Sequence, residues 1–298
     1  MTITVASGKG GAGKTSIAAA LAASLAPKCV VADCDVDAAN GAIALGAILR
    51  EREPYSAGPG FLIDPIACRG CGLCAKACRF EAIQLVPDSG RYEIVPELCE
   101  RCGACLDVCP AGAVVTHEKE AGRLFMSETR LGLALVHAEL VPGEDTSGKL
   151  VRKVRDRAEA AARDGYSIVV DSSPGIGCPV IASLSGCDLV VVVVEASASG
   201  IRDAERLLEL VFSMKRKAVG LVNKAGLDAR MDARAKAALS NAGIPLAGEI
   251  PFDPALRSIE ETGRTWAEVE GAAGTQARSS IKAIQGVIAR NSKRNTRS

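Results

Sequence analysis

The stretch ITVASGKGGAGKTSIAAALAA, residues 3–23, decides the fold. An apolar, partly β-branched run leads into a glycine-rich loop, and an alanine-rich run that favours a helix follows. Strand, glycine loop and helix in this order are the setting that a phosphate-binding loop requires, and the loop fits the pattern G-x-x-x-x-G-K-[ST] in full. The stretch therefore predicts the opening of a nucleotide-binding α/β domain.

Each residue type in this loop has a chemical task. The glycines let backbone N–H groups face the phosphates, and the dipole of the following helix adds positive potential there. Lys14 would reach the β- and γ-phosphates, and the Thr15 hydroxyl would bind Mg²⁺. The predicted ATP-binding residues of the loop are Gly8, Lys9, Gly10, Gly11, Ala12, Gly13, Lys14, Thr15 and Ser16.

The rest of the chain alternates strand-like and helix-like runs, which predicts a doubly wound, mostly parallel α/β sheet. The strand-like runs lie at residues 29–32, 167–170, 189–194, 218–222 and 247–250. Asp35 and Asp171 come at or just after the ends of two of them, where nucleotide chemistry takes place in such sheets. Asp37 is either a second carboxylate near Mg²⁺ or the N-cap of a helix.

A duplicated cysteine run is the second strong signal. Each copy reads C-x-x-C-x-x-C-x-x-x-C, and every cysteine recurs 31 residues later, as from Cys68 to Cys99. This spacing is typical of two 4Fe–4S clusters in which the fourth cysteine of each run binds the other cluster. The predicted ligand sets are Cys68, Cys71, Cys74 and Cys109 for one cluster, and Cys99, Cys102, Cys105 and Cys78 for the other.

Two other uses of the cysteines fit less well. Zinc sites usually show two C-x-x-C pairs, and disulfides require an oxidising compartment. One departure from the repeat is Arg79, which stands where the second run has Pro110, so that the two clusters are expected to be unequal.

Length and charge bound the remaining possibilities. A chain of 298 residues has room for one large domain with a small insert, and its net charge of +1 does not mark it as a nucleic-acid binder. We predict a P-loop domain at 1–54 and 119–298, interrupted at 55–118 by a small α+β ferredoxin-like insert with two clusters. The sequence shows neither a leader nor an apolar run of transmembrane length, and we expect a cytoplasmic protein.

The early lysine of the loop, in Lys9-Gly-Gly-x-Gly-Lys-Thr, resembles that of the deviant Walker A ATPases: MinD, ParA, the Mrp-type scaffold ATPases and the nitrogenase iron protein. With the segments 33–40 and 171–179 and the insert between them, nearly the whole chain resembles MinD-superfamily P-loop ATPases that carry a two-cluster ferredoxin domain. The resemblance implies a homodimer in which Lys9 reaches the partner's nucleotide.

The same resemblance implies roles for further residues. Asp35 would orient the attacking water and take part in the Mg²⁺ site, and Asp171 would hold Mg²⁺ through water. The backbone N–H of Gly175 would sense the γ-phosphate. Asn223 and Pro251 match positions that frame adenine; the alternatives are a strand-end cap and an ordinary turn.

Three smaller features complete the sequence. Cys178, seven residues after Asp171, matches the cysteine of a dimer-bridging cluster, but residues 123–147 offer no second cysteine for one, so it is expected to pack near a dimer axis. Ser147 is predicted to cap a helix at 149–163. The mildly amphipathic segment 280–290 lacks aromatic anchors and is predicted to be a packing helix rather than a membrane-binding one.

These features predict an ATPase that couples the nucleotide state of a homodimer to electron transfer through two 4Fe–4S clusters to a protein partner. One alternative is an ATP-controlled iron–sulfur carrier or maturation factor, whose partner would be a client metalloenzyme. Another is a redox-sensing, ParA-like positioning switch, which would bind membrane or DNA. The sequence does not decide among these three functions.

Overall fold

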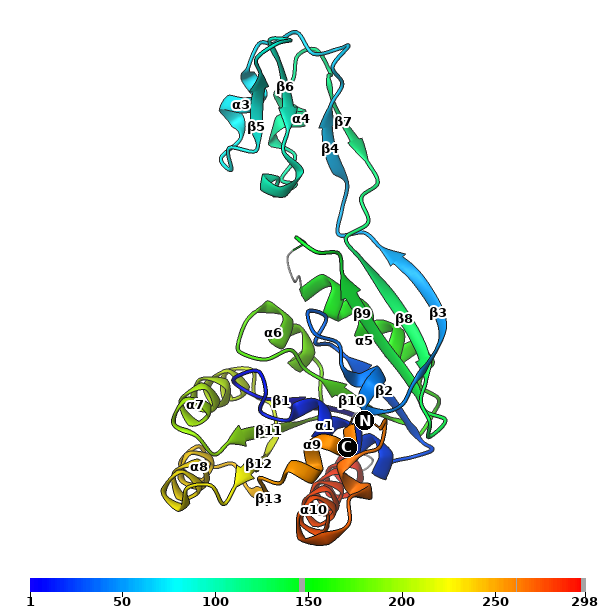
Figure 1. Ribbon diagram of the computed structural model, residues 1–298, viewed down its shortest axis with the longest axis vertical. Coiled ribbons are helices and arrows are strands. Elements are labelled where there is room, and N and C mark those ends of the chain that lie inside the picture. Colours follow the sequence, from blue (N-terminus) through cyan, green and yellow to red (C-terminus); the bar gives the residue numbers. More distant parts are fainter. Residues whose placement is uncertain (145–147, 261, 296–298) are drawn as a thin grey trace. The chain divides into compact units, whose positions relative to one another are not determined.

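The computed structural model describes residues 1–144, 148–260 and 262–295, and Figure 1 shows their secondary structure. The chain forms two compact units. The first comprises Met1–Glu53, Arg123–Leu140 and Thr146–Ser298, and the second comprises Pro54–Gly122 and Val141–Asp145. The sequence predicts an insert at 55–118. The second unit also includes the segment 141–145, which that prediction leaves out and which follows the strand at Ala134–Leu140 of the first unit.

The first unit is built on a nine-stranded sheet, counted over the described residues, with the order β13-β12-β11-β1-β10-β2-β9-β8-β3. The pairs from β13 to β9 are all parallel, which confirms the predicted fold class. The strands are β1 (Thr2–Ala6), β2 (Cys29–Asp33), β3 (Ile48–Tyr55), β8 (Gly122–Glu128), β9 (Ala134–Leu140), β10 (Ser167–Asp171), β11 (Leu189–Glu195), β12 (Ala218–Ala225) and β13 (Leu246–Pro251).

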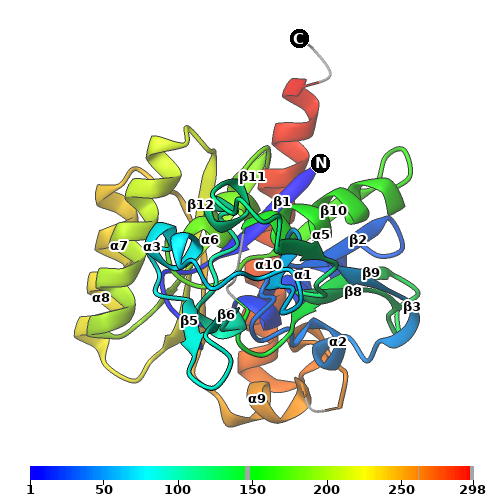
Figure 2. The same ribbon diagram turned by 90° about the horizontal axis from the view of Figure 1, so that it is seen from above.

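Helices cover both faces of this sheet. They are α1 (Lys14–Ser24), α2 (Gly41–Ala44), α5 (Gly148–Ala161), α6 (Cys178–Leu184), α7 (Ala198–Ser213), α8 (Ala229–Asn241), α9 (Pro254–Glu260) and α10 (Gly271–Asn295), with a 3₁₀ turn η2 (Trp266–Glu268). The two long helices α7 and α8 lie side by side (Figure 2). The predicted cap of α5, Ser147, lies outside the described residues.

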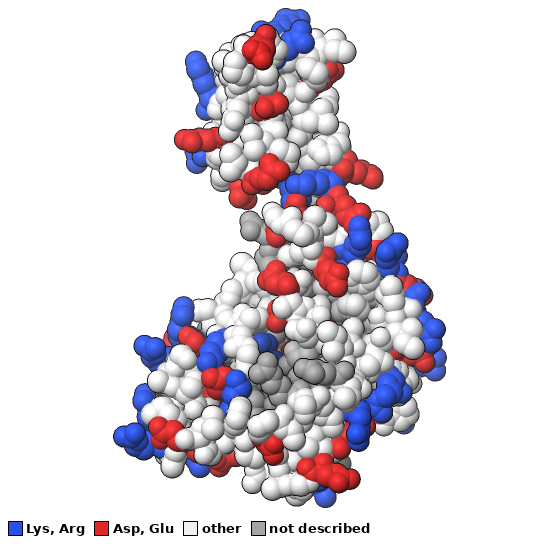
Figure 3. All heavy atoms as spheres, in the orientation of Figure 1, with Lys and Arg blue, Asp and Glu red and all other residues white. Residues whose placement is uncertain are grey.

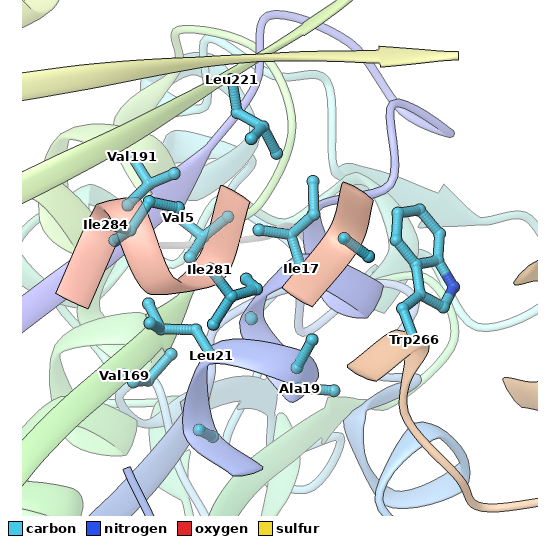
Figure 4. Packing of buried hydrophobic residues seen from close by; sticks show 14 of the residues in the cluster. Val5, Ile17, Ala19, Leu21, Val169, Val191, Leu221, Trp266, Ile281 and Ile284 are labelled. Atoms are coloured by element: carbon cyan, nitrogen blue, oxygen red, sulfur yellow. The ribbon is translucent and has the colours of Figure 1, made fainter. Parts of the chain in front are cut away.

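Two hydrophobic cores lie on the two faces of the sheet, because successive residues of a buried strand point to opposite sides. Val191 and Val193 of β11 pack in the core that contains α1 and α10 (Figure 4). Val190, Val192 and Val194 pack in the core that contains α6, α7 and α8.

The C-terminal helix α10 belongs to the first of these cores. Its isoleucines Ile281, Ile284 and Ile288 are buried there, and Figure 4 shows the first two beside α1. The prediction of a packing helix at 280–290 is confirmed. Among the described residues, no helix combines the length and the apolar character that crossing a membrane requires.

The second unit is a small α+β structure with internal duplication. Strands β4 (Gly60–Ile63) and β7 (Val114–His117) form one antiparallel pair, and β5 (Ile83–Val86) and β6 (Arg91–Ile94) form another. Each cysteine run contains one short helix, α3 (Leu73–Ala77) or α4 (Ala104–Asp107), and a 3₁₀ turn η1 (Pro96–Leu98) precedes the second run. The small core of this unit is built largely around the cysteines themselves.

Candidate functional sites: a phosphate-binding loop and two cysteine-lined cavities

The loop between β1 and α1 has the shape that its glycines predict. Gly13 is the N-cap of α1 with a φ of 92°, a left-handed conformation that favours glycine. A Cβ on Gly13 would collide with the side-chain amide of Asn223, and a Cβ on Gly8 would collide with the backbone of Asp203 in α7. Glycine at both positions therefore lets the loop pack against its neighbours and begin the helix.

Lys14 and Thr15 lie in the first turn of α1, beside acidic groups from two other strands. Burial raises the pKa values of Asp33, Asp35 and Asp171, and the buried Lys14 ammonium offsets part of this rise. Burial and the neighbouring Asp37 raise the pKa of Asp35, so its pKa lies above the usual range. The structure thus brings together the predicted residues Lys14, Thr15, Asp35 and Asp171.

Asp171 is the most unusual of these carboxylates. It ends β10 and is almost completely buried, and neither of its carboxylate oxygens makes a hydrogen bond within the described residues. Burial raises its pKa well above the ordinary value, the negative charge of Asp33 adds to this, and the nearby Thr15 hydroxyl and Lys14 lower it in part. A buried carboxylate without a partner, beside a threonine hydroxyl, fits a hard cation such as Mg²⁺.

Asp33 is a site residue that the sequence did not single out. It ends β2 directly opposite Asp171 in the β2–β10 register, and its side chain is fully buried. Its carboxylate accepts the backbone N–H groups of Asp35, at 3.0 Å, and of Gly41, at 2.8 Å. Burial raises its pKa to about 6 despite these two bonds. Asp33 therefore shapes the loop that carries Asp35.

Asp37 does not cap a helix. The next helix, α2, begins at Gly41 with Asn40 at its N-cap position, so the N-cap interpretation of Asp37 is wrong. The side chain of Asp37 is exposed, and it is close enough to Asp35 to raise the pKa of that carboxyl.

Lys9 is held within its own chain. Its Nζ lies 2.6 Å from Oε1 of Glu195 at the end of β11, and 3.2 Å from the hydroxyl of Ser199. Oε2 of Glu195 lies 2.9 Å from Nζ of Lys224. Burial raises the pKa of Glu195, but the two lysines and the Ser197 hydroxyl outweigh it, so the pKa lies below its usual value. Glu195 was not predicted, because nothing local marks it.

Two of the predicted nucleotide contacts, Asn223 and Gly175, make hydrogen bonds to protein groups. Asn223 is buried, and its Nδ2 donates to the Ala12 carbonyl at 2.8 Å, which ties β12 to the phosphate-binding loop. The N–H of Gly175, which was predicted to face the γ-phosphate, donates instead to the Ser7 carbonyl at 3.1 Å. Pro251 ends β13, and the next residue, Phe252, is half exposed and donates its N–H to Ala225.

The second unit contains two separate cavities that the eight cysteines of the runs line. The first is lined by Cys68, Cys71, Cys74 and Cys109. The second is lined by Cys78, Cys99, Cys102 and Cys105. Each cavity therefore takes three cysteines from one run and the last cysteine from the other run, in the sets that the spacing predicted. All twelve cysteines of the chain have free thiols, and Cys178 is exposed at the start of α6.

Within each set, the negative charge of neighbouring thiolates raises the pKa of a buried thiol. Burial raises the pKa of Cys74, and the charges of Cys109 and Cys68 add to it. In the second cavity, burial raises the pKa of Cys105, and Cys99 and Cys102 act in the same direction. A cationic iron–sulfur core would relieve this repulsion, so the donor set fits such a group.

Backbone N–H groups also point at the sulfurs. Burial raises the pKa of Cys109, yet the N–H groups of residues 111–114 outweigh it, so its pKa lies below the ordinary value. The N–H of Ala113 lies 3.3 Å from the Cys109 sulfur. Such donors stabilise negative charge on ligand sulfurs and tune the reduction potential of a cluster.

The fold and the loop define a P-loop nucleotide-binding α/β protein. Residues 3–266 match the profile of the CobQ/CobB/MinD/ParA nucleotide binding domain, and the chain belongs to this family. It is 33% identical over 236 residues to an uncharacterised protein of Methanocaldococcus jannaschii, which covers 76% of this chain and 79% of that protein.

Two further likenesses cover the two parts of the molecule. A segment of 60 residues, 20% of this chain, is 35% identical to a ferredoxin of Alicyclobacillus acidocaldarius and covers 74% of it, so the chain carries a ferredoxin-like segment. The septum site-determining protein MinD of Pyrococcus horikoshii, solved with Mg-ADP, shares the fold with a TM-score of 0.58 and 16% identity over 98% of this chain and 99% of that one. The predicted family, a MinD-like domain with an inserted ferredoxin-like domain, is confirmed.

Proposed function

We propose that this chain is an ATP-hydrolysing iron–sulfur protein that couples the nucleotide state of a homodimer to electron transfer through two 4Fe–4S clusters to a protein partner. The observation that carries the proposal is the crossed division of the eight cysteines between two cavities, on a chain that also has a complete phosphate-binding loop. Two clusters that are each bound by three cysteines of one run and the last cysteine of the other form one compact unit suited to transferring single electrons.

At the nucleotide site, Lys14 and the N–H groups at the start of α1 would neutralise the phosphates. Thr15 and Asp171 would hold Mg²⁺, which polarises the phosphate oxygens when it is bound. Asp35 lies in the segment between β2 and α2 and would orient the attacking water. Asp33 would keep the Asp35 loop in place through its two backbone hydrogen bonds.

Dimer formation would depend on the release of Lys9. A nucleotide phosphate on a second copy offers Lys9 a stronger anion than Glu195, and its loss on hydrolysis would return the lysine to its own chain. The switch loop at 172–177 would respond to the same phosphate. Gly175 must break its bond to Ser7 before its N–H can donate to a ligand.

The chain itself connects these nucleotide-sensing segments to the cluster-bearing unit. Strands β3 and β8 lead into and out of that unit, and β9, which follows β8, pairs with β2, at whose end Asp33 lies. The segment 141–145 precedes α5, and Arg155 of α5 donates to the Ala182 carbonyl of α6 at 2.9 Å. Because α6 follows the switch loop directly, a movement of that loop has a covalent and packed route toward the clusters.

The test combines ATP hydrolysis with an EPR-monitored redox titration of anaerobically purified protein. We expect two clusters per chain, with potentials that change when a non-hydrolysable ATP analogue replaces ADP. Lys14→Ala should lower hydrolysis by about a hundredfold or more, because it removes a charge that acts on the transferred phosphoryl group, and should abolish the shift of potential. Lys9→Ala is the matched variant in the same loop and should keep nucleotide binding while losing the dimer.

Two results would contradict the proposal. If Lys14→Ala hydrolyses ATP at the wild-type rate, the assignment of the nucleotide site is wrong. The second result has two parts: the reduction potentials of the two clusters do not change with nucleotide, and the clusters transfer intact to an apo-acceptor protein. It would indicate that the function is cluster delivery and not electron transfer.

A further inference from the structure

The two cysteine runs are copies in spacing but opposites in charge. Aligned by their shift of 31 residues, the runs differ at three exposed positions, where the first has an apolar or basic side chain and the second an acidic one. The matched pairs are Ile66 and Glu97, Arg69 and Glu100, and Lys76 and Asp107. From 66 to 78 the first run has two positive charges and no negative one, whereas from 97 to 109 the second has three negative charges and one positive.

The charges that differ lie at the cavities or on the short helices beside them. Arg69 lines the first cavity, and Glu100 lines the second. Lys76 lies in α3, and Asp107 lies in the corresponding helix α4. The first cavity is therefore bordered by positive charge and the second by negative charge.

The one basic residue of the second run does not reverse this difference. Arg101 forms an ion pair with Glu144, whose side chain is only 6% exposed and which also pairs with Lys119, so the charge of Arg101 is partly offset inside the second unit. Arg79 of the first run is exposed and follows Cys78, a residue of the second cavity. Its positive charge weakens the difference between the two cavities without removing it, since the second run carries three acidic residues against the single Arg101.

The first run also presents an apolar anchor. Ile66 is 88% exposed, and the turn that displays it is fixed by Asp64, whose Oδ1 accepts the Ile66 N–H at 2.8 Å. Leu73 is 44% exposed, and the cavity-lining Cys71 is exposed close to it in sequence. Both signs of charge occur on the surface of this unit (Figure 3). An apolar centre with a polar rim, whose charge complements that of the partner, is the usual composition of a specific protein contact.

We propose that the first-run face, defined by Ile66, Arg69, Leu73 and Lys76, docks an acidic one-electron carrier protein, and that the matched second-run face does not. This rests on the proposed function, since the electron passes between the partner's redox centre and the cluster of the first cavity. One centre loses a single electron and the other gains it, with no bond or proton transferred. Positive charge at the first cavity also stabilises a reduced cluster, so the first electron added to the unit resides there.

The test uses the full chain with its clusters and two charge-reversed variants that are matched by the repeat. The variants are Arg69→Glu/Lys76→Glu and Glu100→Lys/Asp107→Lys. The probe is an oxidised, acidic plant-type [2Fe–2S] ferredoxin, whose binding is measured calorimetrically at low and high salt. We expect the first variant to bind at least tenfold more weakly with a flatter salt dependence, and the second to bind as well as wild type or better.

A second, milder variant keeps the result independent of folding. Ile66→Glu places in the first run the residue that the second run already has, and we expect it to weaken binding several-fold with unchanged iron content. In an EPR-monitored titration with dithionite, Arg69→Glu/Lys76→Glu should lower the potential of the cluster that is reduced first.

Equal effects of the two charge reversals, or no binding of the ferredoxin by wild type, would overturn the docking face. Absence of iron and sulfide from wild-type protein would instead overturn the proposed function, and the two failures are thus distinguishable.

Discussion

Nζ of Lys9 lies 2.6 Å from Oε1 of Glu195, an ion pair that joins residues from the phosphate-binding loop and from the end of β11. The lysine that the family resemblance assigns to a partner's nucleotide is therefore neutralised within its own chain. Glu195 is shared with Lys224 at 2.9 Å and accepts the Ser197 hydroxyl at 2.9 Å. Formation of the proposed dimer would have to compete with this arrangement.

We expect Glu195→Gln to strengthen the ATP-dependent dimer. The substitution keeps the size of the side chain and removes the charge that holds Lys9, and a partly exposed ion pair of this kind is worth about 0.5–1 kcal/mol. Because both copies must release Lys9, the gain counts twice, and the dimerisation constant with a non-hydrolysable ATP analogue should rise about five- to thirtyfold by sedimentation equilibrium. Lys224→Met is the matched control: it leaves Glu195 entirely to Lys9 and should weaken the dimer. A weaker dimer in Glu195→Gln would show that Glu195 does not compete with dimer formation.

Asp171→Asn should stabilise the nucleotide-free protein at neutral pH. Burial and Asp33 raise the pKa of Asp171 in the folded state above the value of about 3.9 that it has in the unfolded chain. Between these two pKa values the folded state binds more protons, so this group's contribution to stability falls as the pH rises through the window. Removing the charge should add about 1–3 kcal/mol to the free energy of unfolding at pH 7.5.

The gain from Asp171→Asn should shrink toward pH 4, where the native carboxyl is already neutral. Urea unfolding in EDTA at several pH values measures it, and the same variant should lose ATP hydrolysis. A gain that grows on acidification would refute the assigned direction of the pKa shift.

The crossed cavities make a sharp prediction for double cysteine variants. Cys68→Ser/Cys109→Ser removes two thiols from one cavity and should leave one 4Fe–4S cluster per chain. Cys68→Ser/Cys78→Ser removes one thiol from each cavity and should disturb both clusters. Iron and acid-labile sulfide per chain, together with EPR spin counts, distinguish the two. If each run instead bound its own cluster, the outcomes of the two variants would be exchanged.

Local patterns explain what the sequence could predict. The phosphate-binding loop and the two cysteine runs are short motifs whose geometry depends on neighbouring residues, so their positions and the cysteine sets followed from spacing. The buried parallel strands were visible as continuous apolar runs, as in β11. By contrast, β3 is exposed and carries four charges at the sheet edge, so no apolar pattern marked it. The neighbouring strands β8 and β9 were also missed.

Contacts distant in the chain could not be predicted in this way. Asp33 becomes a site residue only through the register of β2 against β10, which sets it opposite Asp171. Glu195 meets Lys9 because β11 lies next to β1 in the sheet. The occupied N–H of Gly175 likewise depends on how the switch loop packs against Ser7. Motifs thus identify the chemistry, whereas the partners that restrain each residue come from the tertiary fold.

The last prediction concerns Arg101, which occupies the repeat position of Gly70. Both residues have left-handed backbones, with φ of 53° at Arg101 and 67° at Gly70, and only glycine adopts this conformation without cost. Arg101 is held by the ion pair of its Nη2 with Glu144, and its buried Nη1 has no hydrogen-bond partner among the described residues. Glu144→Ala should therefore destabilise the second unit by about 1–3 kcal/mol, because it leaves the largely buried guanidinium of Arg101 unpaired.

When it is added to Glu144→Ala, Arg101→Gly should restore most of the stability that Glu144→Ala removes. Glycine at position 101 removes the unpaired charge and relieves a left-handed backbone strain of about 1 kcal/mol. In Arg101→Gly alone, Glu144 still has Lys119 as its partner, at 2.8 Å in the wild-type structure. The double variant Arg101→Gly/Glu144→Ala should accordingly unfold in urea at a higher concentration, and release iron to a chelator more slowly, than Glu144→Ala alone. Additive losses in the double variant would mean that Glu144 acts on the segment 141–145 through Lys119 and not through the second cysteine run.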